Sequence, residues 1–368
     1  MNPILVVVLT GVFTASACAL IGTFLLLRRM AMMADAISHA ILPGLVAGYF
    51  IARGPNVWVG AIGAAGAGLL TVLLVEVLLR SGRVKQDAAI GLVFPALFAL
   101  GTFLVSKFFA NVHLDTDAIL YGEIALAPFD LLIVNGYSVG PQPLYILGGI
   151  TIINLIFVLL FYKELKLATF DGAFAATIGF SPVVLHYALM TMVSLTTVGA
   201  FTAVGAILVV AFLIVPAATA YLLTDRLPVM IGLSVVVGII SAVLGYVLAI
   251  VLDASIAGAM ATVAGLCFGL ALLFAPQHGL LAKTMRRIRQ RKQFATEMLV
   301  VHLAHHEGTP EQAQESSLGH LQADLRWTAQ FATDVVRRAT QSGLVQRQNG
   351  HLELTNDGRT LAQTVTAR

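Results

Sequence analysis

Long apolar runs alternate with short polar connections over most of the chain. About nine of these runs are long enough to form a helix across a bilayer, which needs roughly 20 residues. Gly199 and Gly205 mark either a tight turn or a kink between two of them. The pattern predicts an all-α polytopic membrane protein with about nine transmembrane helices. The runs lie near residues 4–27, 36–52, 56–79, 88–108, 144–161, 183–202, 205–223, 228–252 and 257–275.

Basic residues follow every second run, and this alternation predicts how the chain is oriented. Short cytoplasmic connections of membrane proteins are enriched in Lys and Arg. If all the basic connections are cytoplasmic, the N-terminus is outside and the C-terminal region is in the cytoplasm. The basic positions are Arg28, Arg29, Arg80, Arg83, Lys85, Lys163, Lys166, Arg226 and the segment 283–292.

The chain changes character after the ninth run and becomes polar and basic. Within the last part, the pattern predicts a helix over 328–342, two short strands around Asn349-Gly350, and a helix capped by Thr355. This order of elements is that of a winged helix-turn-helix. The predicted domains are a transmembrane domain over 1–283, a basic helix with a polar linker over 284–317, and a small cytoplasmic winged-helix domain over 318–368.

Composition supports the membrane assignment and excludes several enzyme classes. The chain is 58% hydrophobic and 11% charged, with a mean hydropathy of +0.89, whereas soluble domains carry about 25% charge. Cys18 and Cys267 lie in apolar runs, where free cysteine acts as a small core residue. The sequence contains no GxxxxGK[ST], HExxH or GxSxG motif. We therefore expect no enzymatic activity, and any ATP hydrolysis on a separate chain.

The strongest candidate for chemistry is the stretch RRMAMMADAISHAILP, residues 28–43, between the first two runs. Asp35 and His39 are four residues apart and share one face of a helix. Ionisable residues beside membrane spans are costly and usually functional, and an oxygen with a nitrogen donor suits Mn, Fe or Zn. Pro43 favours a helix break nearby. The structural alternatives are a helix N-cap for Asp35 and an interhelical hydrogen bond for His39.

Two connections carry further polar patterns. In the segment 163–182, Asp171 begins a short helix that Gly179 and Pro182 end. This helix either transmits force from a soluble partner or is an amphipathic linker. The external loop 109–143 is either an acidic metal-binding funnel or a solvated docking surface. Its ionisable residues include His113, Asp115, Asp117, Glu123 and Asp130.

Four sequence segments resemble the membrane subunits of ABC importers for manganese, zinc and iron. They are LLRRMAMMADAISHAILPG, DAILYGEI, FDGAFAATIGF and VGAILVVAFLIVPAATA, and the resemblance covers roughly residues 5–275. It implies a helical permease that works as a homodimer or with a paralogous permease in the bacterial inner membrane. It also implies partner ABC ATPases and an external metal-binding protein, with no permanently bound cofactor.

The resemblance implies roles for particular residues. Asp35 and His39 match the metal-coordinating Asp and His of the family, and Asp171 to Gly179 matches the coupling helix that seats in the ATPase. Family members usually carry an acidic residue about two positions after that Asp, where this chain has Ala173.

The C-terminal extension resembles the DNA-reading half of diphtheria-toxin-repressor-type metalloregulators, through RRATQSGLVQRQNGHLELTNDGRTLA. This resemblance favours manganese or iron over zinc as the transported ion. His302 and His306 on the preceding helix are four residues apart, so they either bind a metal together or form a solvated helix face. We expect the domain to contact the ATPases or the second permease.

Two other functions are compatible with parts of the sequence. A membrane-tethered, metal-responsive regulator would use Arg337, Arg338 and the basic stretch 286–292 to contact nucleic acid. An ion-coupled secondary transporter would need buried proton-relay acids in the spans, and few are present. The basic patch is diluted by Glu307, Glu311, Glu315, Asp324 and Asp334.

Overall fold

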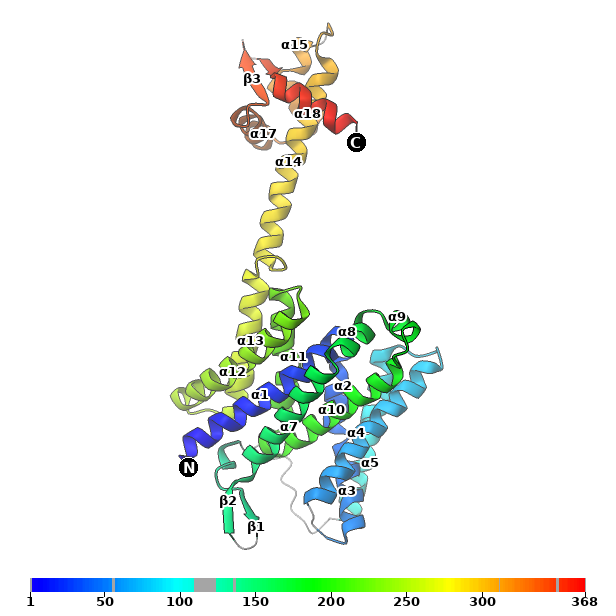
Figure 1. The fold of residues 1–368 in the computed structure, drawn as a ribbon. Helices are drawn as coiled ribbons and strands as arrows, with labels where there is room; N and C mark the ends of the chain where they lie inside the picture. The colour runs from blue at the N-terminus through cyan, green and yellow to red at the C-terminus, as the bar shows by residue number, and fades with distance from the viewer. Residues whose placement is uncertain are drawn as a thin grey trace. The chain divides into compact units, whose positions relative to one another are not determined.

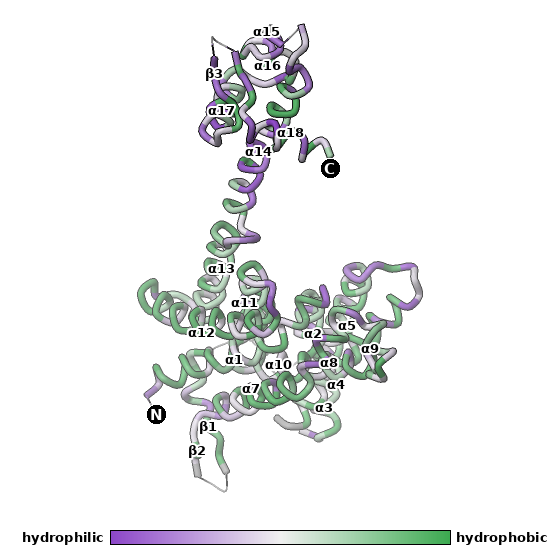
Figure 2. Tube along the Cα trace, turned by 45° about the horizontal axis from the view of Figure 1, so that its top comes forward, coloured by the Kyte–Doolittle hydropathy of each residue, from purple (hydrophilic) through white to green (hydrophobic). Residues whose placement is uncertain are grey.

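The computed structural model describes residues 2–54, 57–108, 124–134, 137–310, 312–348 and 351–367. It divides into two compact units, Met1–Gly279 and Leu280–Arg368. Figure 1 shows the first unit as a bundle of long helices, and Figure 2 shows that this bundle is hydrophobic along most of its length.

The first unit contains the predicted spans. Within the described residues, eight helices are long and apolar enough to cross a membrane, and α2 with α3 form a further pair bent by 41°. The helices are α1 (Pro3–Leu27), α2 (Ala31–His39), α3 (Ile41–Ala52), α4 (Val57–Arg80), α5 (Gln86–Phe108), α7 (Gln142–Leu160), α8 (Tyr162–Phe170), α9 (Gly172–Thr177), α10 (Pro182–Val204), α11 (Ala206–Leu223), α12 (Leu227–Leu252) and α13 (Ile256–Phe274). The prediction of a polytopic helical membrane protein is confirmed.

The expectation of an all-α fold is wrong in one connection. A short 3₁₀ helix, η1 (Ile124–Leu126), precedes the antiparallel strands β1 (Leu131–Val134) and β2 (Tyr137–Pro141). The sequence between the strands is Asn135-Gly136, a dipeptide that favours two-residue hairpin connections. This local signal competes with helix formation, so the protein is mostly helical rather than all-α.

Helix α1 lies at the centre of the first unit and packs against α7, α10, α11 and α12. Its C-terminal half is buried without interruption from Thr14 to Leu25. Small residues allow the close approach: a Cβ on Gly22 would lie 1.9 Å from the carbonyl oxygen of Leu213 in α11. Such close contacts stabilise helix pairs in lipid, where the hydrophobic effect adds little between helices.

The region 183–223 forms two separate helices. Helix α10 ends at Val204 and α11 begins at Ala206. Gly205 between them has φ of 82° and ψ of 165°, a conformation that residues with a side chain rarely adopt. The sequence was compatible with either a turn or a kink at this position, and the structure has a turn at Gly205.

The second unit has its own core, formed by residues such as Leu299, Leu303, Leu321 and Val335. Strands β3 and β4 pair antiparallel, with Val345 opposite Leu354. Thr355 caps the last helix by accepting a hydrogen bond from the Gly358 N–H at 3.1 Å, as predicted. The elements are α14 (Leu280–His306), α15 (Gln312–Glu315), α16 (Leu318–Asp324), α17 (Ala329–Gln341), β3 (Val345–Gln348), β4 (His351–Leu354) and α18 (Asn356–Thr366).

Candidate functional site

The candidate site lies where α2 ends and α3 begins. In a continuous helix, the N–H at position 43 would bond to the carbonyl oxygen of His39, but proline has no N–H to donate. The chain bends by 41° between the two helices, around Ala40. Helix α3 is held close to α4, because a Cβ on Gly44 would lie 2.2 Å from the carbonyl oxygen of Gly63. Pro43 therefore removes one helical hydrogen bond at the junction of α2 and α3, close to His39.

Asp35 and His39 lie side by side on one face of α2. His39 Nε2 is 3.4 Å from Asp35 Oδ1, and the side chains are 28% and 42% exposed, respectively. The neighbouring positions Ala34, Ala36 and Ser38 are buried, because α2 packs against α4, α5, α10 and α11. The two donors thus occupy the face of α2 that this packing leaves accessible.

Aromatic rings from α5 flank the imidazole. The ring of His39 lies 5.1 Å from that of Phe94 and 6.1 Å from that of Phe98, measured between centroids. Such contacts restrict the rotation of the imidazole and leave its Nε2 atom on the side of the carboxylate. The N-cap alternative for Asp35 is excluded, because α2 begins four residues earlier at Ala31 with Met30 as its N-cap.

The pair offers only two ligands from this chain. Within the described ranges, no third His, Cys, Asp or Glu comes close enough to complete a metal-binding group with it. Met33 nearby is 1% exposed and belongs to the core, while Met32 is 54% exposed. A cation bound here would take its remaining ligands from water, backbone carbonyls or another chain.

The candidate coupling segment is a short exposed helix. Asp171 is the N-cap of α9, and its Oδ1 accepts a hydrogen bond of 2.9 Å from the Phe174 N–H. Ala173 is exposed, and Gly179 ends the segment with φ of 96°. The large apolar side chains Phe174 and Ile178 are 51% and 53% exposed. The segment therefore presents a capped helix with an uncovered apolar surface.

Sequence reasoning missed a polar link between these two regions. Arg28, directly after α1, donates a hydrogen bond of 3.1 Å from Nε to Thr169 Oγ1 in α8. Burial lowers the pKa of the Arg28 guanidinium, which stays protonated because its normal pKa is so high. The bond joins the chain just before α2 to the chain just before α9. Arg28 was visible in the sequence only as one of many basic connection residues.

Other polar side chains in the spans serve packing. Glu76 and Arg80 of α4 form an ion pair, with Oε1 and Nη2 2.7 Å apart, and Tyr187 of α10 also donates a hydrogen bond to Glu76. Asn154 of α7 donates a hydrogen bond of 2.8 Å to Thr196 of α10. The bonds of Tyr187 and Asn154 join helices within the first unit.

The acidic loop 109–143, which the sequence predicts to be external, falls largely outside the described residues. His113, Asp115, Asp117 and Glu123 lie there, as does most of the motif DAILYGEI. Of that group, the described part of the chain includes Asp130, which is exposed. Its backbone carbonyl accepts a hydrogen bond of 2.8 Å from Gln142 N–H.

A bundle of candidate spans with a carboxylate and an imidazole at a helix bend defines a polytopic membrane permease. The chain belongs to the ABC 3 transport family, whose model matches residues 1–275. This match covers the whole set of candidate spans, including both helices of the site.

Some relatives match almost the whole chain, and others match about three quarters of it. The zinc transport system membrane protein TroD of Treponema pallidum is 46% identical over 359 residues, covering 97% of each chain. The manganese transport system membrane protein MntD of Bacillus subtilis is 47% identical over 289 residues, covering 78% of this chain and 98% of MntD. The match to TroD therefore extends into the second unit.

A solved structure has the same arrangement of helices. PsaBC from Streptococcus pneumoniae, in complex with a Fab, matches with a TM-score of 0.64 and 30% sequence identity. The match covers 76% of this chain and 94% of the PsaBC chain. The fold of the first unit is thus that of an ABC permease.

Proposed function

We propose that this chain is the membrane-spanning subunit of an ABC importer for divalent transition-metal ions. The observation that carries the proposal is the pairing of Asp35 Oδ1 and His39 Nε2 at 3.4 Å, on the accessible face of α2 in an ABC 3 permease. In this proposal the ion passes from an external binding protein, along the Asp35 and His39 side chains, to the cytoplasm.

The ligand chemistry supports a borderline metal as cargo. One carboxylate oxygen and one imidazole nitrogen suit Mn, Fe and Zn, whereas Mg and Ca prefer oxygen ligands alone. The relatives named above are a zinc and a manganese transport protein. We favour manganese, with iron and zinc as the alternatives that uptake competition among the three ions would distinguish.

Two ligands from one chain favour a second permease subunit in the site. A second copy, or a paralogous permease, would add the same two donors and so bring four to a shared ion.

The energy for transport would come from separate ABC ATPases that dock on α9. The exposed Phe174 and Ile178 offer an apolar contact, and the Asp171 cap keeps the helix formed. We assign Asp171, Ala173 and Gly179 to this contact. Helix α9 and the β1–β2 hairpin lie at opposite ends of the first unit (Figure 1), which supports an ATPase at one end and an external metal-binding protein at the other.

We place the chain in the bacterial inner membrane with its N-terminus outside and its C-terminal unit in the cytoplasm. The hydrogen bond from Arg28 to Thr169 and that from Gln86 to the Arg29 carbonyl oxygen bring three connections to the same end of the bundle. Those connections are basic, and basic connections favour the cytoplasmic side.

We further propose that the C-terminal unit contains a winged helix-turn-helix over 318–368. The order of α16, α17, the β3–β4 hairpin and α18 supports it. Arg337 is already paired with Asp334 at 2.6 Å, which weakens its attraction for nucleic-acid phosphates. We therefore assign this unit to contacts with protein partners and not to a membrane-tethered regulator.

The site is tested by replacing the imidazole. We expect His39→Ala to abolish ATP-driven uptake of Mn²⁺ in vesicles that contain the permease and its ATPases, because only one donor per chain remains. The matched control is His278→Ala, which removes an imidazole that faces Asp225 at 3.7 Å, away from the site. Uptake by His39→Ala at the rate of the control would refute the assignment.

A further inference from the structure

A second group of metal-ligand side chains lies in the C-terminal unit, far along the chain from Asp35 and His39. His302, His306 and Glu315 each place one donor atom within 4.8 Å of the others. His302 Nε2 is 3.2 Å from Glu315 Oε2, and these two side chains are only 11% and 15% exposed. Of the described residues, this is the one group of three such side chains that could hold an ion.

The local fold explains how these residues meet. His302 and His306 are one turn apart near the end of α14, so both imidazoles leave the same face of the helix. The chain then reverses at Gly308, whose φ is 79°. The Gly308 N–H donates a hydrogen bond of 2.9 Å to Gln312 Oε1. This turn returns the chain so that Glu315, at the end of α15, faces the two imidazoles.

We propose that His302, His306 and Glu315 bind one divalent transition-metal ion, and that Zn²⁺ fits this set best. In tetrahedral zinc sites the ligands lie about 2.0–2.2 Å from the ion, which places neighbouring ligand atoms roughly 3.3 Å apart. The His302–Glu315 separation of 3.2 Å matches that spacing. Two His and one Glu leave a fourth position for water or for a ligand from a partner.

His320 is a positioning residue for this site. Its Nε2 lies 2.9 Å from the same Oε2 atom of Glu315, and the residue sits on α16, directly after the turn that carries Glu315. Groups that hydrogen-bond to a metal ligand fix its orientation and raise its affinity for the ion. The contact holds the Glu315 carboxylate toward α14.

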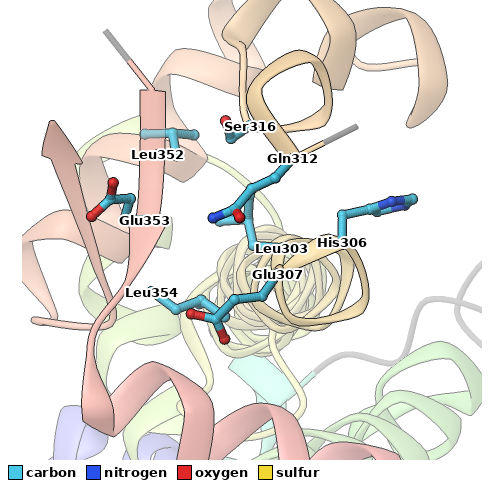
Figure 3. Close-up of a pocket in the computed structure, with 8 residues that line it drawn as sticks. All are labelled: Leu303, His306, Glu307, Gln312, Ser316, Leu352, Glu353 and Leu354. Carbon is cyan, nitrogen blue, oxygen red and sulfur yellow. The ribbon is translucent and has the colours of Figure 1, made fainter. Parts of the chain in front are cut away.

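The site borders a small pocket and shares His306 with it. That pocket is lined by Leu303, His306, Glu307, Gln312, Ser316, Leu352, Glu353 and Leu354. In Figure 3 the imidazole of His306 points away from the other labelled side chains and from β4. The ring is therefore directed away from the other side chains that line the pocket.

A bound ion would join the end of α14 to α15 through metal–ligand bonds. The competing interpretation is that Glu315 only accepts hydrogen bonds from the surrounding imidazoles. The two interpretations differ in metal binding, because a hydrogen-bonded cluster without a metal role changes stability when it is mutated but has no affinity for Zn²⁺ to lose.

The test uses the full-length chain in detergent, carrying His39→Ala to remove a donor of the other candidate site. We expect Co²⁺, used as a probe for Zn²⁺, to give the intense visible absorption of a four-coordinate ion at one ion per chain. This measurement needs no change to the C-terminal unit, so it decides the question even if variants there fold poorly. The absence of that absorption would overturn the proposal.

Variants then assign the ligands. Glu315→Gln and the double variant His302→Gln/His306→Gln should each weaken Zn²⁺ binding by more than about 100-fold, and His320→Gln by roughly 10- to 100-fold. The matched control is His305→Gln, which removes the exposed imidazole from the same turn of α14 and should leave the affinity unchanged. Equal Zn²⁺ affinity in Glu315→Gln and in the control would overturn the proposal.

Discussion

Asp35 contributes the negative charge of the candidate site, and His39 contributes its nitrogen ligand. The carboxylate is 42% exposed, so it can exchange water for an ion without unfolding its surroundings. The phenyl rings of Phe94 and Phe98 limit where the imidazole can turn. The two residues therefore combine one hydrated carboxylate ligand with one restrained imidazole ligand.

Removing the charge of Asp35 tests its contribution separately from its shape. Asp35→Asn keeps the size of the side chain and an oxygen donor but loses the attraction to a divalent cation. We expect at least a tenfold loss of apparent metal affinity, or about 1.4 kcal/mol, measured from the concentration dependence of uptake. Asp35→Glu is the control that keeps the charge, and it should retain part of the affinity. Equal affinity in the Asn variant and the parent would show that the carboxylate does not meet the ion.

The sequence predicted the pairing of Asp35 with His39 but not the residues that surround the pair. The four-residue spacing alone places Asp35 and His39 on one helix face. The contacts with Phe94 and Phe98 depend on how α5 packs against α2, which no local pattern contains. The same holds for Glu315, whose approach to His302 depends on a reversal of the chain at Gly308.

Two short helices of the first unit carry the candidate ligand pair and the proposed contact with the ATPase. Helix α2 carries the ligand pair and ends at the bend before Pro43, and α9 carries the exposed apolar surface. The hydrogen bond from Arg28 to Thr169 links the chain ends that precede them. We therefore expect a displacement of α9 to shift the start of α2, through the Arg28 side chain and a few residues of backbone.

Removing the N-cap of α9 tests whether this helix must stay folded to make its contact with the ATPase. Asp171→Ala removes the acceptor for the Phe174 N–H, and the loss of such a cap costs about 0.5–2 kcal/mol. We expect lower ATP-driven uptake with unchanged membrane insertion, because a frayed α9 makes a poorer contact with the ATPase. Asp171→Ser, which can still cap the helix, should retain uptake. If the Ala variant transports as well as the Ser variant, α9 does not need its cap to transmit force.

The elements themselves were largely predictable from the sequence. The nine apolar runs match the eight candidate spans and the bent pair, because length and hydropathy suffice to define a span. Gly205 was recognised as a breakpoint, although only its positive φ distinguishes the turn from a kink. The β1–β2 hairpin was not predicted, because the long loop that contains it is rich in acidic and apolar residues and shows no clear hydrophobic periodicity. Its one local signal is the dipeptide Asn135-Gly136.

The whole molecule combines a permease unit with a second, compact unit that some relatives do not have. MntD is covered over 98% of its length by 78% of this chain, whereas TroD matches 97% of both chains. We therefore expect transport to be separable from the function of the second unit. The composition change after the ninth run predicted such a division, but the core contributed by the C-terminal half of α14 appears only in the structure.

A chain ending at Gly279 tests this separation. We expect it to insert, to bind its ATPases through α9 and to take up metal at a rate near that of the full chain, because both candidate elements lie before Gly279. Uptake and co-purification of the ATPase are the measurements. Loss of uptake in a truncated chain that is well inserted and still bound to the ATPase would show that the second unit takes part in transport.

The most direct measurement of the central claim is the position of the ion itself. The permease complex can be crystallised with Mn²⁺ and examined by anomalous scattering at the manganese edge. We predict a peak within about 2.0–2.3 Å of His39 Nε2 and of an Asp35 carboxylate oxygen, the range of metal–ligand bonds in proteins. A peak elsewhere in the spans, with Asp35 and His39 still bound only to each other, would contradict it.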